Sequence, residues 1–81
     1  MKDFSELSFE SVPLLWKDRE EIFKANKVDL KECKIDSAGM AFLVQWAKSL
    51  PSHQLAICNA PKNALDLIST YKLSELFNIE P

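Results

Sequence analysis

The chain has 81 residues, of which 47% are hydrophobic and 27% charged, with a formal net charge of −2. This size and composition predict one small globular domain over residues 1–81. The mildly acidic balance argues against a nucleic-acid-binding protein, which would need a basic face. No apolar run is long enough to cross a bilayer, and the polar start lacks the apolar core of a signal peptide. We therefore expect a cytoplasmic domain.

The first third of the chain predicts a short strand and then one helix. Residues 3–9 are ambiguous, and the inward-facing candidates of such a strand are Phe4, Leu7 and Phe9. From Ser11, a candidate N-cap, apolar residues recur at spacings of three and four as far as Asn26. This periodicity is typical of an amphipathic helix, and Pro13 is tolerated in its first turn.

The middle of the chain alternates between strand and helix patterns. Val28 and Leu30 alternate with polar residues, which predicts a strand over residues 27–33 whose pattern slips near its end. A second helix is expected over residues 38–49, ending before Pro51. The apolar residues 54–58 then predict a central strand.

The last third predicts another helix and one more short element. Pro61 suits the first turn of a helix that fades near Lys72. Residues 73–79 supply a final apolar segment, either a helical turn or an edge strand. The alternating order of short elements predicts an α/β fold, with parallel neighbouring strands and helices packed on the sheet.

The second helix carries two apolar stripes. The first stripe consists of Met40, Leu43, Val44 and Ala47. The second consists of Ala38, Phe42 and Trp46, with Gln45 beside them. Because a thin domain buries only one side of a surface helix well, the second stripe is either the edge of the core or a partner-facing patch. Trp46 is compatible with both.

Residues suited to catalysis are scarce. The single histidine, His53, has no neighbouring nucleophile and acid, and the single glycine, Gly39, is too few for a phosphate-binding loop. Cys33 and Cys58 make no metal-binding pattern and are expected to be small, reduced, buried residues. We therefore expect no enzymatic activity, no cofactor and no metal.

The segment Asp36-Ser37-Ala38-Gly39 connects a predicted strand directly to a predicted helix. Ser37 is expected at the helix N-terminus, where its hydroxyl can accept a bond from a free backbone N–H. Gly39 is expected to leave room for a close approach to the backbone. The segment is either a simple helix cap or a site where something binds.

Residues 28–43, with Val28-Asp29-Leu30 followed by Asp36-Ser37-Ala38-Gly39, resemble the central motif of STAS domains. Residues 14–21 and the stretch ending in Tyr71-Lys72-Leu73 are similar to the first and last helices of the small STAS subunits of Mla phospholipid transporters. The resemblance implies a small mixed sheet with helices packed on it. Relative to the family, the chain is expected to enter at the second strand. Either the first N-terminal strand is absent, which would leave a sheet edge open or weaken the fold, or the assigned start lies too late.

The resemblance implies a non-catalytic regulatory subunit. It would bind the cytoplasmic ATPase of a phospholipid-transporting ABC complex that maintains outer-membrane lipid asymmetry. Through this ATPase it would reach the membrane permease, at the periphery of the inner membrane. The implied partner-binding residues are Asp36, Ser37, Ala38, Gly39, Ala41, Gln45 and Trp46.

Two alternatives remain open from the sequence. The chain could be an anti-sigma-factor antagonist, in which an anti-sigma-factor kinase phosphorylates Ser37. A phosphate at this helix N-terminus would meet backbone N–H groups and add about two negative charges beside Asp36. The other alternative is a stand-alone remnant without a partner, suggested by the shortened N-terminus.

Overall fold

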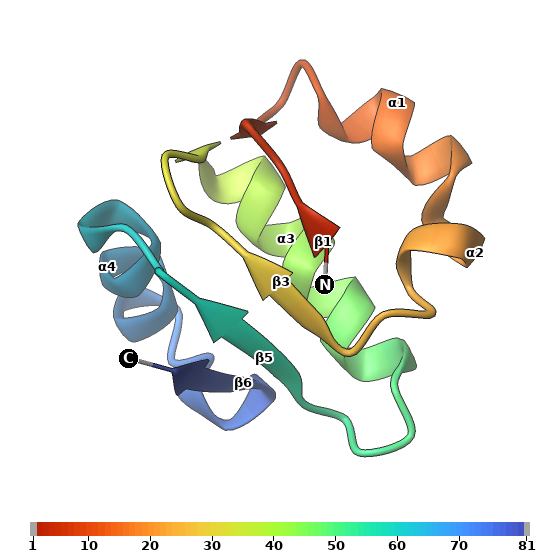
Figure 1. Ribbon diagram of the computed structural model, residues 1–81. Coiled ribbons are helices and arrows are strands. Elements are labelled where there is room, and N and C mark those ends of the chain that lie inside the picture. The colour runs from red at the N-terminus through yellow and green to blue at the C-terminus, as the bar shows by residue number, and fades with distance from the viewer. Residues whose placement is uncertain (1, 81) are drawn as a thin grey trace.

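Helices pack on one face of a parallel sheet in the computed structural model, which describes residues 2–80 (Figure 1). In chain order the elements are β1 (Lys2–Asp3), β2 (Glu6–Leu7), α1 (Val12–Lys17), α2 (Arg19–Ile22), β3 (Lys27–Asp29), β4 (Lys34–Ile35), α3 (Ser37–Ser49), β5 (Leu55–Cys58), α4 (Lys62–Thr70), the 3₁₀ turn η1 (Ser74–Leu76) and β6 (Phe77–Glu80). No helix in this described part is both long and apolar enough to span a membrane.

The strands form two separate sheets. The main sheet has the order β1-β3-β5-β6, and β2 pairs only with β4. Every pairing among the described strands is parallel, so the prediction of a mixed sheet was wrong. Within the main sheet, each connection between neighbouring strands contains a helix that brings the chain back to the end of the sheet where the previous strand began. The next strand therefore runs parallel to it. The α/β class and the parallel neighbours are confirmed.

The N-terminal residues form two strands, where the sequence predicted one. β1 pairs with β3 and β2 pairs with β4, so the expected open edge beside β3 is occupied by β1. Leu7 is fully buried as predicted, but Phe9 is 79% exposed, so its assignment as an inward residue was wrong. Strands of two residues are too short to show an alternating pattern.

Of the single strand predicted over residues 27–33, only β3 (Lys27–Asp29) forms, and residues 30–33 are outside any strand. A turn follows β3, where the Asp29 carboxylate accepts the Lys31 N–H at 2.9 Å and Glu32 has a φ of 58°. Asp favours such turns because its side chain bonds to the backbone two residues later. After the turn, Lys34 and Ile35 pair with β2.

The helix predicted from Ser11 to Asn26 is two short helices. It breaks at Asp18, whose φ and ψ are −101° and 14° and whose N–H bonds to the Leu15 carbonyl at 3.0 Å. Ser11 precedes α1, but its hydroxyl makes no capping bond to the helix. The break turns α2 so that Ile22 is buried and Phe23 packs on the core.

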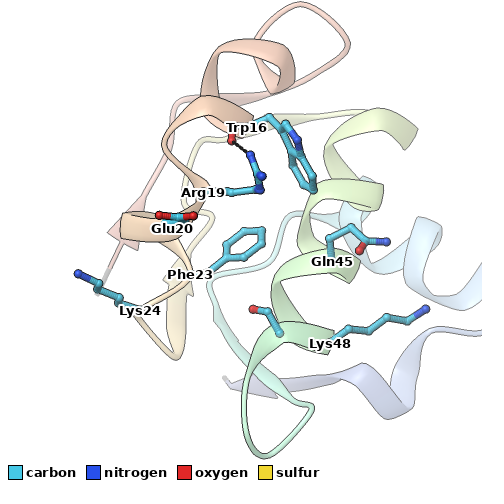
Figure 2. Close-up of a pocket in the computed structure, with 8 residues that line it drawn as sticks. Trp16, Arg19, Glu20, Phe23, Lys24, Gln45 and Lys48 are labelled. Atoms are coloured by element: carbon cyan, nitrogen blue, oxygen red, sulfur yellow. Dashed lines mark hydrogen bonds between the residues drawn. The ribbon is translucent and has the colours of Figure 1, made fainter.

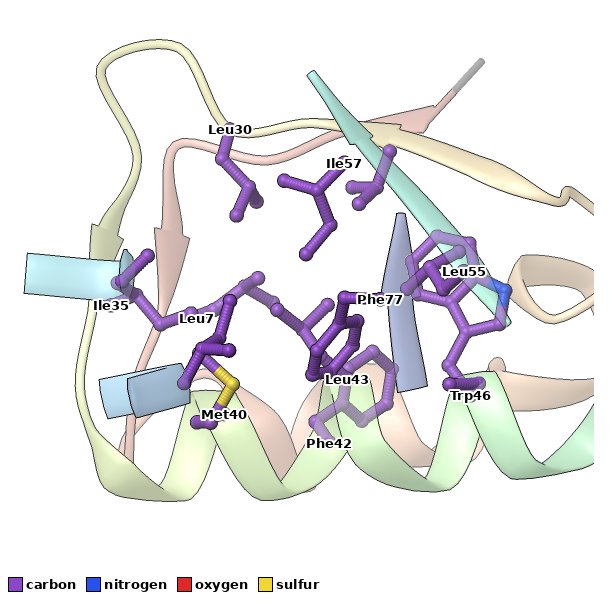
Figure 3. Packing of buried hydrophobic residues seen from close by; sticks show 14 of the residues in the cluster. Leu7, Leu30, Ile35, Met40, Phe42, Leu43, Trp46, Leu55, Ile57 and Phe77 are labelled. Carbon is purple, nitrogen blue, oxygen red and sulfur yellow. The ribbon is translucent and has the colours of Figure 1, made fainter. Parts of the chain in front are cut away.

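The core lies between the main sheet and α3. Figure 3 shows Leu55 and Ile57 of β5 above Leu43 and Phe42 of α3. No helix crosses the near face of the sheet in Figure 1. Because successive side chains of a strand point to opposite faces, Cys58 points away from the face of buried Leu55 and Ile57. It is only half-buried, with its Sγ 3.3 Å from a Glu80 carboxylate oxygen, so its expected place in the core was wrong.

Candidate functional site

The Asp36 carboxylate organises the junction between β4 and α3. Its Oδ1 accepts the Gly39 N–H at 3.0 Å, and its Oδ2 accepts the Phe9 N–H at 3.0 Å. These backbone donors, Gly39 first and then Phe9, lower the pKa of the Asp36 carboxyl. The carboxylate therefore ties the loop before α1 to the first turn of α3.

Asp36, and not Ser37, is the N-cap of α3. The prediction that Ser37 caps the helix was wrong by one position. Asp is as effective a cap as Ser, and its extended backbone places the carboxylate over the Gly39 N–H. Ser37 is then the first helical residue, and its side chain is exposed.

Gly39 does not leave an open approach to the backbone. The residue is buried, and a Cβ built on it would lie 1.9 Å from the Leu7 carbonyl oxygen. Strand β2 fills the space that the sequence assigned to a partner. Gly39 therefore supports the site without being accessible to a partner, while Ala38 beside it is partly exposed.

Trp46 is a core residue. Its side chain has 0% exposure, and its indole N–H donates to the Ala25 carbonyl at 2.8 Å. Its ring stacks on Phe23 with a centroid separation of 5.9 Å. Assigning Trp46 to the partner-binding surface was wrong, because α2 and the turn after it cover the second stripe of α3.

The exposed face of α3 carries three of the predicted site residues. Ser37, Ala41 and Gln45 are all exposed and succeed one another at intervals of four, so they lie in one row along the helix. Ser37 and Ala41 are small, and none of the three side chains in the row is charged. It leaves the helix backbone accessible to a partner over two turns.

A groove of about 370 Å³ runs beside this row, between α3 and the end of α4. Its lining residues are Ser37, Met40, Ala41, Val44, Gln45, Tyr71 and Leu73. None of these side chains is charged, and the Tyr71 ring is 54% exposed. The groove presents hydroxyl and amide groups around an apolar floor, and this chemistry suits recognition of another molecule by contact.

The sequence-based site list missed Tyr71 and Leu73. The turn after α4 holds them: the Leu73 N–H bonds to the Ile68 carbonyl at 2.9 Å and the Lys72 N–H to the Ser69 carbonyl at 3.2 Å. This is a Schellman arrangement, with Lys72 at a φ of 56° where glycine is more usual. The signal was Tyr71-x-Leu73, which the sequence analysis used only for the resemblance, and without a glycine the pattern does not predict the turn that brings these residues to the groove.

Comparison with family models, with curated proteins and with solved structures produced no match to this chain.

Proposed function

We propose that this chain is a STAS-like, MlaB-like subunit that binds the ATPase of a phospholipid-transporting ABC complex. One observation carries the proposal: Ser37 and Tyr71, from two of the three segments on which the resemblance rests, line one uncharged groove. These segments are separated in sequence, and nothing local requires them to meet. Their meeting at one groove is expected if both segments form a single binding surface.

The chemistry of the groove supports binding to a protein. Tyr is enriched among the residues that dominate protein interfaces, because it offers a large apolar ring and a polar tip at little cost in conformational entropy. Ala41 and Ser37 are small, so a partner backbone or helix can approach α3 closely. The partner surface that fits is apolar at its centre and uncharged.

In this role the domain itself would bind no nucleotide and move no lipid. It would hold an MlaF-like ATPase in a shape competent for assembly with the membrane permease. The expected location is the cytoplasmic side of the inner membrane, reached through the ATPase, and the expected outcome is maintenance of outer-membrane lipid asymmetry.

The alternative is an anti-sigma-factor antagonist switched by phosphorylation of Ser37, and the exposure of that side chain favours it. Two features oppose it. The Asp36 carboxylate already accepts the Gly39 N–H, which a phosphoryl group would otherwise use. The same carboxylate would repel a phosphate on the adjacent residue. Docking of an unmodified Ser37 is therefore the better-supported function.

The experiment is a pull-down of the tagged chain from its native cells, with bound proteins identified by mass spectrometry. Alongside it, Ala41→Arg places a long cation in the exposed row, and Ser69→Arg places the same group on an exposed position of α4 that does not line the groove. We expect an ABC ATPase with the wild-type chain and with S69R, and its loss with A41R. Recovery of a kinase and a sigma factor would instead establish the antagonist.

A further inference from the structure

A second groove lies on the other side of α3 (Figure 2). It has a volume of about 540 Å³ and lies between α1 and α2 on one side and α3 on the other. One side is lined by α1, α2 and the two residues after α2, and the other side by α3. The lining residues are Trp16, Arg19, Glu20, Phe23, Lys24, Gln45, Lys48 and Ser49. Gln45 also lines the Tyr71 groove, so the two grooves adjoin along one helix.

The floor of this second groove is aromatic and fixed. The Trp16 side chain is 40% exposed, and its ring meets Phe23 and Phe42 edge-on, each at a centroid distance of 6.3 Å. Phe42 is 2% exposed and therefore anchors this cluster in the core. The part of Trp16 that stays exposed with Arg19 lying over its ring is available to an apolar group.

Arg19 lies in the groove with most of its hydrogen-bonding capacity unused. Its guanidinium carbon is 4.6 Å from the centre of the Trp16 ring, and its Nη1 donates to the Trp16 carbonyl at 2.9 Å. The ring and the carbonyl fix the plane of the guanidinium, whose other N–H groups remain for a ligand. A planar guanidinium held in this way matches a carboxylate.

The charge of the groove is opposite to that of the chain. Arg19, Lys24 and Lys48 line it against the single carboxylate of Glu20, whereas the chain has a formal net charge of −2. Lys24 is paired with Glu21 at 3.1 Å, but no described carboxylate forms an ion pair with Arg19 or Lys48. Lys24 and Lys48 extend outward from opposite rims (Figure 2).

We propose that this groove binds an acidic segment of the partner protein, with an Asp or Glu carboxylate on Arg19 and a neighbouring apolar side chain on Trp16. Lys48 adds longer-range attraction for further carboxylates. The inference rests on the proposed function only in assigning the segment to the ATPase, since the chemistry of the groove is independent of that identity. Because the grooves share Gln45, one partner can occupy both.

The test uses the full chain and a displayed library of random ten-residue peptides, selected against wild type after depletion on the variant Arg19→Glu/Lys48→Glu. Selected peptides are made synthetically and titrated into labelled protein, with NMR following the two indole N–H signals. Lys17→Glu/Lys62→Glu is the matched control, since it reverses two exposed lysines that do not line the groove.

We expect peptides rich in Asp and Glu next to Phe, Leu or Trp, which shift the Trp16 indole signal and leave that of buried Trp46 in place. Affinity should fall at least tenfold in R19E/K48E, less than twofold in K17E/K62E, and strongly when Gln and Asn replace the peptide's acids. The inference is overturned if no peptide is enriched, or if uncharged peptides bind as tightly as acidic ones. It is also overturned if inorganic phosphate, added at the same concentration of negative charge, displaces the labelled-protein signal as well as the acidic peptides do. If acidic peptides bind but no ABC ATPase is recovered in the pull-down, the proposed function is wrong and this inference stands. If the ATPase is recovered but no acidic peptide binds the groove, this inference is wrong and the proposed function stands.

Discussion

Gly39 of α3 packs directly against the backbone of Leu7 in β2: a Cβ on Gly39 would lie 1.9 Å from the Leu7 carbonyl oxygen and 2.5 Å from its carbonyl carbon. A contact with backbone atoms cannot be relieved by rotating a side chain. The closeness of β2 and α3 therefore depends on the one glycine in the chain.

Gly39→Ala should destabilise the protein although it improves the intrinsic helix propensity of α3. Alanine gains up to about 1 kcal/mol in a helix interior, but overpacking against fixed atoms costs about 1–3 kcal/mol or more. Because the nearest Leu7 atoms are backbone, the overpacking cost is expected at or above the top of this range, for a net loss of about 2 kcal/mol in the free energy of unfolding, measured with urea. Ala41→Ser, exposed on the same helix, should change it by less than about 0.5 kcal/mol. An unchanged urea midpoint in G39A would show that β2 shifts away from the new Cβ at no measurable cost.

Asp36→Ala should lower stability by about 1–2 kcal/mol at pH 7, because it removes the cap of α3 and the bond to the Phe9 N–H. The pKa of the Asp36 carboxyl is lowered on folding, so its contribution is present above the unfolded-state value of about 3.9 and is lost as the pH falls through the folded-state pKa. The gap between wild type and D36A should narrow between pH 5 and 2 in urea titrations. A gap that stays constant over this range would contradict the cap.

Trp46→Phe should destabilise the protein by about 2–4 kcal/mol, since it leaves a cavity and an unpaired Ala25 carbonyl. The partly exposed Trp16 provides the control, and Trp16→Phe should cost less than about 1.5 kcal/mol. Equilibrium unfolding followed by circular dichroism measures both. Equally small losses of unfolding free energy in W46F and W16F would contradict the assignment of Trp46 to the core.

Ser37→Leu should weaken binding to the ATPase while the fold remains intact, because the side chain is exposed and makes no capping bond. We expect at least a tenfold loss in affinity by titration calorimetry and a change in unfolding free energy within about 0.5 kcal/mol. Thermal stability falling in proportion to affinity would count against a pure interface role.

Tyr71→Ala should reduce the same affinity by about 2 kcal/mol, or roughly thirtyfold, as expected for an interface tyrosine. Leu65→Ala is the matched control, because Leu65 is 41% exposed on α4 but does not line the groove. Titration calorimetry of both variants with the same ATPase distinguishes the contribution of the groove to affinity from that of the rest of α4. Equal affinities for Y71A and L65A would exclude the groove from the interface.

The elements that sequence analysis placed well have local causes. Helix α3 was predicted within one residue, because the signals at its two ends, the Asp36 cap and Pro51, act on adjacent backbone. Strand β5 was predicted over residues 54–58 and forms over Leu55–Cys58, since its apolar run is bounded by prolines and polar residues. The final segment, left open between a turn and a strand, contains both η1 and β6.

The failures have non-local causes. The placement of Lys34 and Ile35 in a second sheet depends on β2, which comes from far earlier in the chain. The all-parallel pairing depends on how the helical crossovers return the chain, and the burial of Trp46 depends on Phe23 lying over it. Alternating patterns record that a side chain is buried, but they do not identify the segment that covers it.

The candidate site divides in the same way. By itself the sequence determined the α/β class and the position of α3, because helix periodicity and capping act within a few residues. Ser37, Ala41 and Gln45 were named from the resemblance, and the position of α3 places them in one exposed row. Only the tertiary structure decided that Gly39 and Trp46 are inaccessible and that Tyr71 joins Ser37 at one groove. Packing between distant segments determines which apolar residues form the core and which remain exposed to a partner.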